Sequence, residues 1–133
     1  MRVYLCRHAK AAPGDPDEAR PLTAKGHDQA KALGERLVRA EPRPTAVVSS
    51  PLVRARETAR AVADALGLGV ELDARLAPGA TLADLELIAA EREGPFVTVG
   101  HQPDCSEIVL ALTGFDPGFP VGSVQAIELG AGG

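Results

Sequence analysis

Residues 5–11 have the sequence Leu-Cys-Arg-His-Ala-Lys-Ala, and this stretch decides the fold that we predict for the chain. The apolar run 3–6 is typical of a short buried strand, because the Ala-Pro-Gly loop at 12–14 ends it too early for a helix. Arg7 and His8 follow the run, at the carboxyl end of the predicted strand. Ligands of open α/β sheets bind at that edge. A cation next to an imidazole therefore indicates an anion site with a nucleophile or a proton carrier.

The alternation of strand and helix continues along the chain. Apolar runs predict further strands at 45–49, 69–72, 96–99 and 124–129, and the segments between the strands have helical periodicity. This order predicts an α/β fold, a three-layer αβα sandwich with a mostly parallel central sheet of about five strands. Residues 12–18 are predicted to form a solvated surface loop, and 130–133 a frayed tail.

The predicted helices have recognisable N-caps. Thr23 caps the first helix, whose buried face carries small and aliphatic residues at helical spacing: Gly26, Ala30, Leu33 and Leu37. Ser50 is predicted to cap a helix from 51 to 66, with Pro51 at its first position. Thr81 is predicted to cap the third helix, and Asp104 or Ser106 the fourth.

The composition limits the classes of function. A chain of 133 residues suits a single domain over 1–133. A net charge of −4 with one Tyr and no Trp is unfavourable for nucleic-acid or anionic-membrane binding, so we expect neither partner. Cys6 and Cys105 form no CxxC pair, and the N-terminus lacks a signal-peptide run. We therefore expect a cytoplasmic protein. We also expect it to be a monomer or a weak dimer.

Four side chains are predicted to gather at one edge of the sheet. Arg7 and His8 follow the first strand, and His101 follows the fourth. Arg54 lies in the first turn after the second strand, and its side chain should lean back over the same edge. Phosphate suits this set, because guanidinium groups donate in pairs to its oxygens. Two neighbours on the same helix are expected to be solvated, Arg56 and Arg60, with Glu57 pairing with Arg60.

These residues and their motifs resemble the histidine phosphatase (phosphoglycerate-mutase-like) superfamily, and most of all its short SixA-type phosphohistidine phosphatase branch. The similar segments span nearly the whole chain in the right order: residues 5–11, 20–26, 49–59, 76–80 and 99–104. The resemblance implies that His8 is the nucleophile and forms a phosphohistidine intermediate. It implies that Arg7, Arg54 and His101 bind the phosphoryl oxygens, and that no metal or cofactor takes part.

Two departures from the wider family bear on the substrate. Ala9 stands where larger members have Gly, which fits the short branch. No acidic residue is placed by a motif to protonate the leaving oxygen, although Glu71, Glu86 and Asp104 are candidates. An imidazole leaving group depends less on a strong acid than an alkoxide does. We therefore expect phosphohistidine in proteins as the substrate, in a crevice left open by the absence of long insertions.

Three alternatives stay open at this point. A phosphatase or mutase of small metabolites would use the same pocket but would need a general acid. A non-catalytic phosphate-binding module would keep the arginines without turnover. A metal site built from Cys6, His8, His101 and Cys105 is disfavoured by the intervening Pro103 and by the repulsion of a cation by the arginines.

Overall fold

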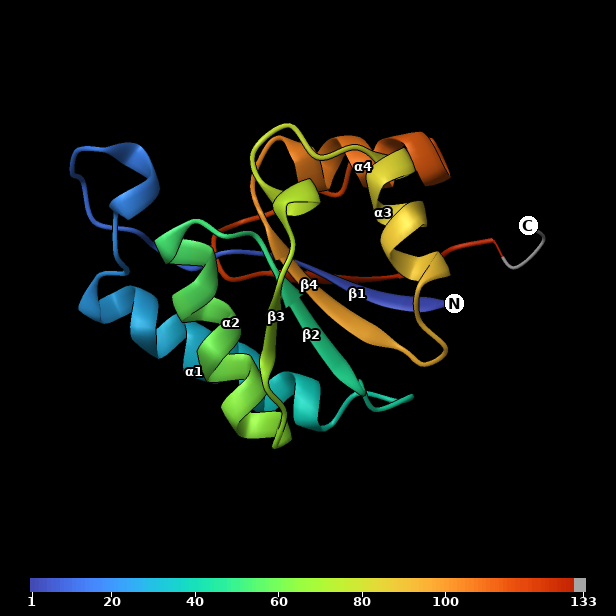
Figure 1. Ribbon diagram of the computed structural model, residues 1–133, viewed down its shortest axis with the longest axis horizontal. Helices are drawn as coiled ribbons and strands as arrows, with labels where there is room; N and C mark the ends of the chain where they lie inside the picture. The colour runs from blue at the N-terminus through green and yellow to red at the C-terminus, as the bar shows by residue number, and fades with distance from the viewer. Residues whose placement is uncertain (131–133) are drawn as a thin grey trace.

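A five-stranded sheet forms the centre of the molecule in the computed structural model, which describes residues 1–130 (Figure 1). The strand order is β3-β2-β4-β1-β5. All pairings are parallel except that of β5 with β1. The strands are β1 (Arg2–Arg7), β2 (Ala46–Ser49), β3 (Val70–Leu72), β4 (Phe96–Gly100) and β5 (Val124–Glu128). Apart from Gly130, the predicted frayed tail lies outside the described residues.

Two pairs of helices cover the two faces of the sheet (Figure 1). Tyr4 and Cys6 of β1 pack in one buried cluster with residues of α1 and α2, whereas Val3 and Leu5 pack in the other with residues of α3 and α4. Alternate side chains of a strand point to opposite faces, so one strand contributes to both cores. The predicted three-layer α/β sandwich is confirmed. The helices are α1 (Ala24–Val38), α2 (Val53–Leu66), α3 (Leu82–Ala90) and α4 (Asp104–Thr113), with short 3₁₀ turns η1 (Asp17–Ala19) and η2 (Ala74–Leu76).

The predicted caps are correct for two helices and wrong for two. Thr23 accepts a hydrogen bond from Gly26 N, and Thr81 forms a capping box with Asp84, as predicted. α2 begins only at Val53, with Leu52 as its N-cap and no side-chain cap. The hydroxyl of Ser50 instead accepts from Leu52 N at 3.3 Å, one turn ahead of the helix.

The N-cap of α4 is Pro103, not Asp104 or Ser106. Asp104 is the first residue of the helix, and its Oδ2 accepts from Gly79 N at 2.8 Å and Ala80 N at 3.2 Å. The Asp104 carboxylate therefore holds the loop at residues 79–80, which precedes α3, and is not free to cap its own helix.

Close backbone packing fixes the segment after His8 against α1. The Gly26 position lies directly against the carbonyl oxygen of Lys10, where a Cβ could not fit. The same carbonyl accepts from Thr23 N at 3.0 Å. Further along α1, a Cβ at Gly34 would lie 3.0 Å from the Cβ of Ala65 on α2. Both glycines of α1 thus allow a neighbouring segment to approach closely. Among residues 1–130, no helix has both the length and the apolar character needed to cross a membrane.

Candidate active site

His8 lies at the carboxyl edge of the sheet, and both its backbone N–H and its carbonyl are hydrogen-bonded. Its N donates to the carbonyl of Gly100 at the end of β4, at 3.0 Å. Its carbonyl accepts from Gly122 N, also at 3.0 Å. The loop before β5 and the end of β4 therefore fix the backbone of the residue that follows β1.

Hydrogen bonds define the protonation state of the His8 ring. Nδ1 lies 2.7 Å from the carbonyl oxygen of Ala9, and Nε2 lies 3.3 Å from Nε of Arg54. A carbonyl can only accept and a guanidinium N–H can only donate. The proton is therefore assigned to Nδ1, and the lone pair of Nε2 faces Arg54.

Arg54 is buried in the first turn of α2, where the sequence predicted it. The turn is locked to the site by Thr58, whose hydroxyl donates to the Arg54 carbonyl at 2.8 Å. The same hydroxyl accepts from Ala9 N at 3.0 Å. One threonine thus holds the helix turn and the peptide after His8 in a fixed relation. Thr58 is not predictable from the sequence, because nothing in the local pattern shows that α2 contacts residue 9.

His101 follows β4 and lies beside His8, with ring centroids 5.3 Å apart and the planes inclined by 56°. Its Nε2 is 2.8 Å from the hydroxyl of Ser50. Burial, then the neighbouring His8, then Arg54 lower the pKa of His101 to about 4. The ring is therefore neutral at neutral pH. The Ser50 hydroxyl, predicted to be a helix cap, is instead a direct partner of this imidazole.

Arg7, the last residue of β1, is the fourth of the predicted site residues. Its Nη1 donates to the carbonyl of Phe119 at 2.8 Å, which fixes the guanidinium. Nε of Arg7 and Nδ1 of His101 are buried and have no hydrogen-bond partner among residues 1–130. Buried polar atoms are nearly always paired, so these two have unused hydrogen-bonding capacity in the protein alone.

The electrostatic field at His8 favours the neutral imidazole. Burial is the largest cause lowering its pKa, and the charges of Arg54, Arg7 and Arg20 lower it further. The hydrogen bond to the Ala9 carbonyl acts in the opposite direction but does not reverse the shift. The same positive charges that keep the ring unprotonated also attract an anion to it.

Asp17 is a further member of this cluster that the sequence does not predict. Residues 12–18 were predicted as a solvated loop, but Asp17 in η1 contacts Arg54 through both its backbone and its side chain. Its other carboxylate oxygen accepts from Nη1 of Arg20 at 2.9 Å. The crevice is therefore less open at Arg54 than expected. No local signal could have found this contact, because it joins a loop and a helix 37 residues apart.

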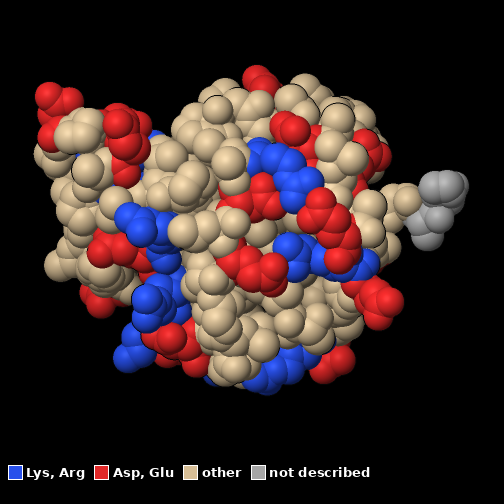
Figure 2. All heavy atoms as spheres, in the orientation of Figure 1, with Lys and Arg blue, Asp and Glu red and all other residues tan. Residues whose placement is uncertain are grey.

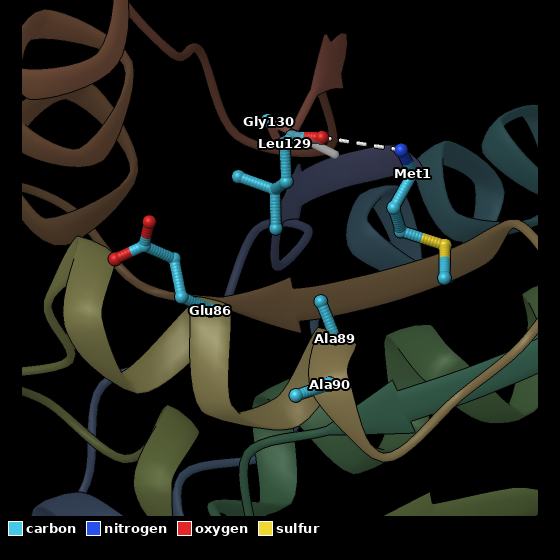
Figure 3. A pocket seen from close by; sticks show the side chains of 6 residues that line it. All are labelled: Met1, Glu86, Ala89, Ala90, Leu129 and Gly130. Carbon is cyan, nitrogen blue, oxygen red and sulfur yellow. Dashed lines mark hydrogen bonds between the residues drawn. The ribbon is translucent and has the colours of Figure 1, made fainter. Parts of the chain in front are cut away.

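The three acidic candidates have other partners or lie elsewhere. Glu71 pairs with Arg92 at 3.0 Å, and Asp104 holds the 79–80 loop. Glu86 lines a hollow with Met1 and Leu129 beside the start of β1, whereas His8 follows the opposite end of that strand (Figure 3).

The remaining charges of α2 lie outside the cluster. Arg56 and Arg60 are exposed, as predicted, and Figure 2 shows basic side chains over the α1 and α2 side of the molecule. Glu57 does not pair with Arg60 as predicted, because its carboxylate accepts from Leu22 N at 2.8 Å. Within residues 1–130, no three His, Cys, Asp or Glu side chains gather closely enough to hold a metal ion.

Comparison with known families places the chain in a class. Residues 3–78 match the model of the histidine phosphatase superfamily, branch 1. The chain belongs to this superfamily and is a phosphatase enzyme of the SixA-type branch.

Three relatives show how far the similarity extends. An uncharacterized protein of Picosynechococcus sp. is 40% identical over 120 residues, covering 84% of this chain and 73% of that protein. A protein named probable phosphoglycerate mutase GpmB from Citrobacter koseri is 41% identical over 83 residues. That match covers 57% of this chain but only 37% of the length of GpmB.

The third relative is a solved structure of the protein histidine phosphatase SixA complexed with tungstate. It has a TM-score of 0.86 and 28% sequence identity, over 97% of this chain and 88% of that one. The similarity to SixA thus extends over almost all of both chains.

Proposed function

We propose that the protein hydrolyses phosphohistidine in other proteins, through a phosphohistidine intermediate on its own His8 and without a metal ion. The observation that carries this proposal is the orientation of the His8 ring. Nδ1 is bonded to the Ala9 carbonyl, so the lone pair of Nε2 lies on the side of Arg54, where a phosphoryl group would bind. A nucleophilic imidazole needs such an unprotonated nitrogen.

The reaction has two steps. Nε2 of His8 attacks phosphorus, and the bond from phosphorus to the substrate nitrogen breaks. The substrate ring, protonated on its other nitrogen, leaves with the electron pair as neutral imidazole. Water then attacks the phosphorus on His8, which releases inorganic phosphate and restores the imidazole. Arg7, Arg54 and His101 bind the phosphoryl oxygens in both steps. Phosphoryl transfer is accelerated mainly by positioning and by charge stabilisation, which these three groups supply.

Two observations favour phosphohistidine as the substrate. None of Glu71, Glu86 and Asp104 is free beside His8 to act as an acid. The carboxylate that does contact Arg54, Asp17, is disfavoured as a proton donor because the hydrogen bond from Arg20 and the charge of Arg54 lower its pKa. A leaving imidazole needs less help from an acid than a sugar alkoxide. The similar solved structure is a protein histidine phosphatase, and it holds tungstate, a tetrahedral oxyanion like phosphate. Within this proposal the enzyme acts in the cytoplasm, as a monomer or a weak dimer and without a cofactor.

A second candidate is a phosphatase of small phosphorylated metabolites. The identity of 41% with GpmB over 83 residues favours it. The same match leaves most of GpmB without a counterpart here, since this chain spans 37% of its length. The two candidate functions use the same phosphoryl site, and they differ in whether a protein or a small metabolite carries the phosphoryl group.

Phosphate release with chelator present tests the proposal on three substrates: a protein carrying phosphohistidine, a sugar phosphate and an aryl phosphate. Wild type should release phosphate fastest from phosphohistidine. His8→Ala should abolish release, whereas His27→Ala, which changes an exposed histidine of α1, should not alter it. A preference for the sugar phosphate would favour the second candidate. Release that stops when chelator is added would contradict the metal-independent mechanism.

A further inference from the structure

The guanidinium of Arg54 is occupied by groups of the protein itself. Its Nη1 donates to the backbone carbonyl of Asp17 at 3.0 Å, and its Nη2 donates to Oδ2 of the same residue at 3.2 Å. Its Nε donates to His8 at 3.3 Å. Each of the three nitrogens thus has an acceptor in the resting protein. A phosphoryl group that reaches His8 competes with acceptors already in place.

The two partners differ greatly in exposure. The side chain of Arg54 is 8% exposed, whereas that of Asp17 is 59% exposed. A buried guanidinium needs acceptors, and a carboxylate oxygen resembles a phosphoryl oxygen as a charged acceptor. Asp17 can turn towards solvent without becoming a buried unpaired charge, because its side chain is already 59% exposed. Arg54 then keeps its bonds to the Asp17 carbonyl and to His8, and the phosphoryl oxygen replaces the carboxylate at Nη2.

We propose that Asp17 is a specificity-determining residue, an internal anion that holds Nη2 of Arg54 until a substrate phosphoryl group replaces it. The proposal rests on the phosphate site of the proposed function. A free phosphate ion must displace the carboxylate with its own oxygens alone. A phosphorylated protein makes further contacts around the site, which compensate for the exchange. The exchange therefore favours phosphoproteins over small phosphates, and the returning carboxylate helps to expel the inorganic phosphate product.

The adjacent residue offers a matched control. Glu18 belongs to the same η1 turn and is exposed, and among residues 1–130 its carboxylate makes no ion pair with Arg54. Asp17→Asn and Glu18→Gln each remove one negative charge from the same turn. Only the first removes the carboxylate that occupies Arg54, so the difference between them isolates the exchange from the general change in charge.

Calorimetric titration with inorganic phosphate, at fixed pH and ionic strength, tests the proposal. Asp17→Asn should bind phosphate about three- to tenfold more tightly than wild type, and Glu18→Gln less than about twofold more tightly. Asp17→Ala, which leaves no side-chain acceptor, should tighten binding at least as much. For an aryl phosphate, KM should fall together with the phosphate dissociation constant in Asp17→Asn, and it should change by less than about twofold in Glu18→Gln. Thermal unfolding of each variant checks that the fold is intact.

Other results would overturn the proposal. Equal binding by Asp17→Asn and Glu18→Gln would mean that only the net charge matters. Weaker binding by Asp17→Asn would mean that the carboxylate positions Arg54 for phosphate. If wild type binds phosphate in either case, the proposed function survives. If neither wild type nor any variant binds phosphate at His8, both proposals fail.

Discussion

Nε of Arg54 donates to Nε2 of His8 across 3.3 Å, which joins the first turn of α2 to the residue that follows β1. The contact orients the imidazole lone pair and places a permanent positive charge beside it. The charge of the arginine also contributes to lowering the pKa of His8.

Loss of Arg54 should impair phosphate binding and turnover together. Arg54→Ala removes the nearest cation of the site and should lower kcat/KM for phosphohistidine by about 10²–10³-fold. Arg54→Lys should recover little, because an ammonium cannot donate like the guanidinium fork. Arg56→Ala changes an exposed arginine of the same helix and should leave kcat/KM within about twofold. Steady-state kinetics of the three variants provides the check, and full activity in Arg54→Ala would show that the site is assigned wrongly.

The pKa of His8 should lie below the ordinary histidine value of 6.5, because burial and the nearby arginines disfavour the imidazolium. At pH 6.5 more than half of the His8 rings should therefore keep the Nε2 lone pair, and the protonated fraction should rise as the pH falls further. Removal of one of these charges in Arg54→Ala should move the midpoint upward. NMR titration of the ring nitrogens measures both midpoints and the tautomer. A midpoint above 6.5 in wild type, or protonation at Nε2 in the neutral ring, would contradict the structure.

His101 should make the folded protein sensitive to acid. Its pKa is lowered from 6.5 to about 4, so between these values the unfolded chain binds a proton that the folded chain does not. The free energy of unfolding should therefore fall as the pH drops from 6.5 towards 4. Denaturant unfolding of wild type and His101→Gln across this range measures the effect, and the variant should show the shallower dependence. Parallel curves would indicate that His101 titrates alike in both states.

Gly26 should tolerate no side chain. A Cβ there would collide with the carbonyl oxygen of Lys10 and lie 3.2 Å from the Cβ of Leu22. Alanine usually stabilises a helix relative to glycine by about 1 kcal/mol, but the collision should reverse the sign and cost about 2 kcal/mol. Gly69→Ala is the control, since among residues 1–130 no atom beyond the two adjacent residues lies within 4 Å of its Cβ position. It should change stability by less than about 0.5 kcal/mol. Equilibrium unfolding compares the two variants.

The fold and the position of the catalytic candidates follow from local signals in the sequence. Strands that alternate with helices predict a parallel sheet, and side chains that follow its strands must meet at one edge. Arg54 was found because side chains in the first turn of a helix lean toward its start. These rules need only the order of elements along the chain.

The errors concern contacts between segments distant in sequence. Ser50 looks like a helix cap, but its hydroxyl is bonded to His101, 51 residues away. Glu57 is spaced to pair with Arg60, but its carboxylate instead accepts a hydrogen bond from the backbone N–H of Leu22. Asp17 is expected in a solvated loop, but its carboxylate accepts a hydrogen bond from Arg54. In each case a tertiary partner displaces a local one, and no pattern within the segment shows which partner prevails.

The position of the phosphoryl group on the trapped intermediate tests the central claim most directly. Wild type mixed with a protein carrying phosphohistidine would be quenched in alkali within milliseconds, and its peptides analysed by mass spectrometry and phosphorus NMR. We predict a phosphoryl group on Nε2 of His8, because Nδ1 holds the proton shared with the Ala9 carbonyl. A phosphoryl group on Nδ1, on His101 or on no residue of the enzyme would contradict the mechanism.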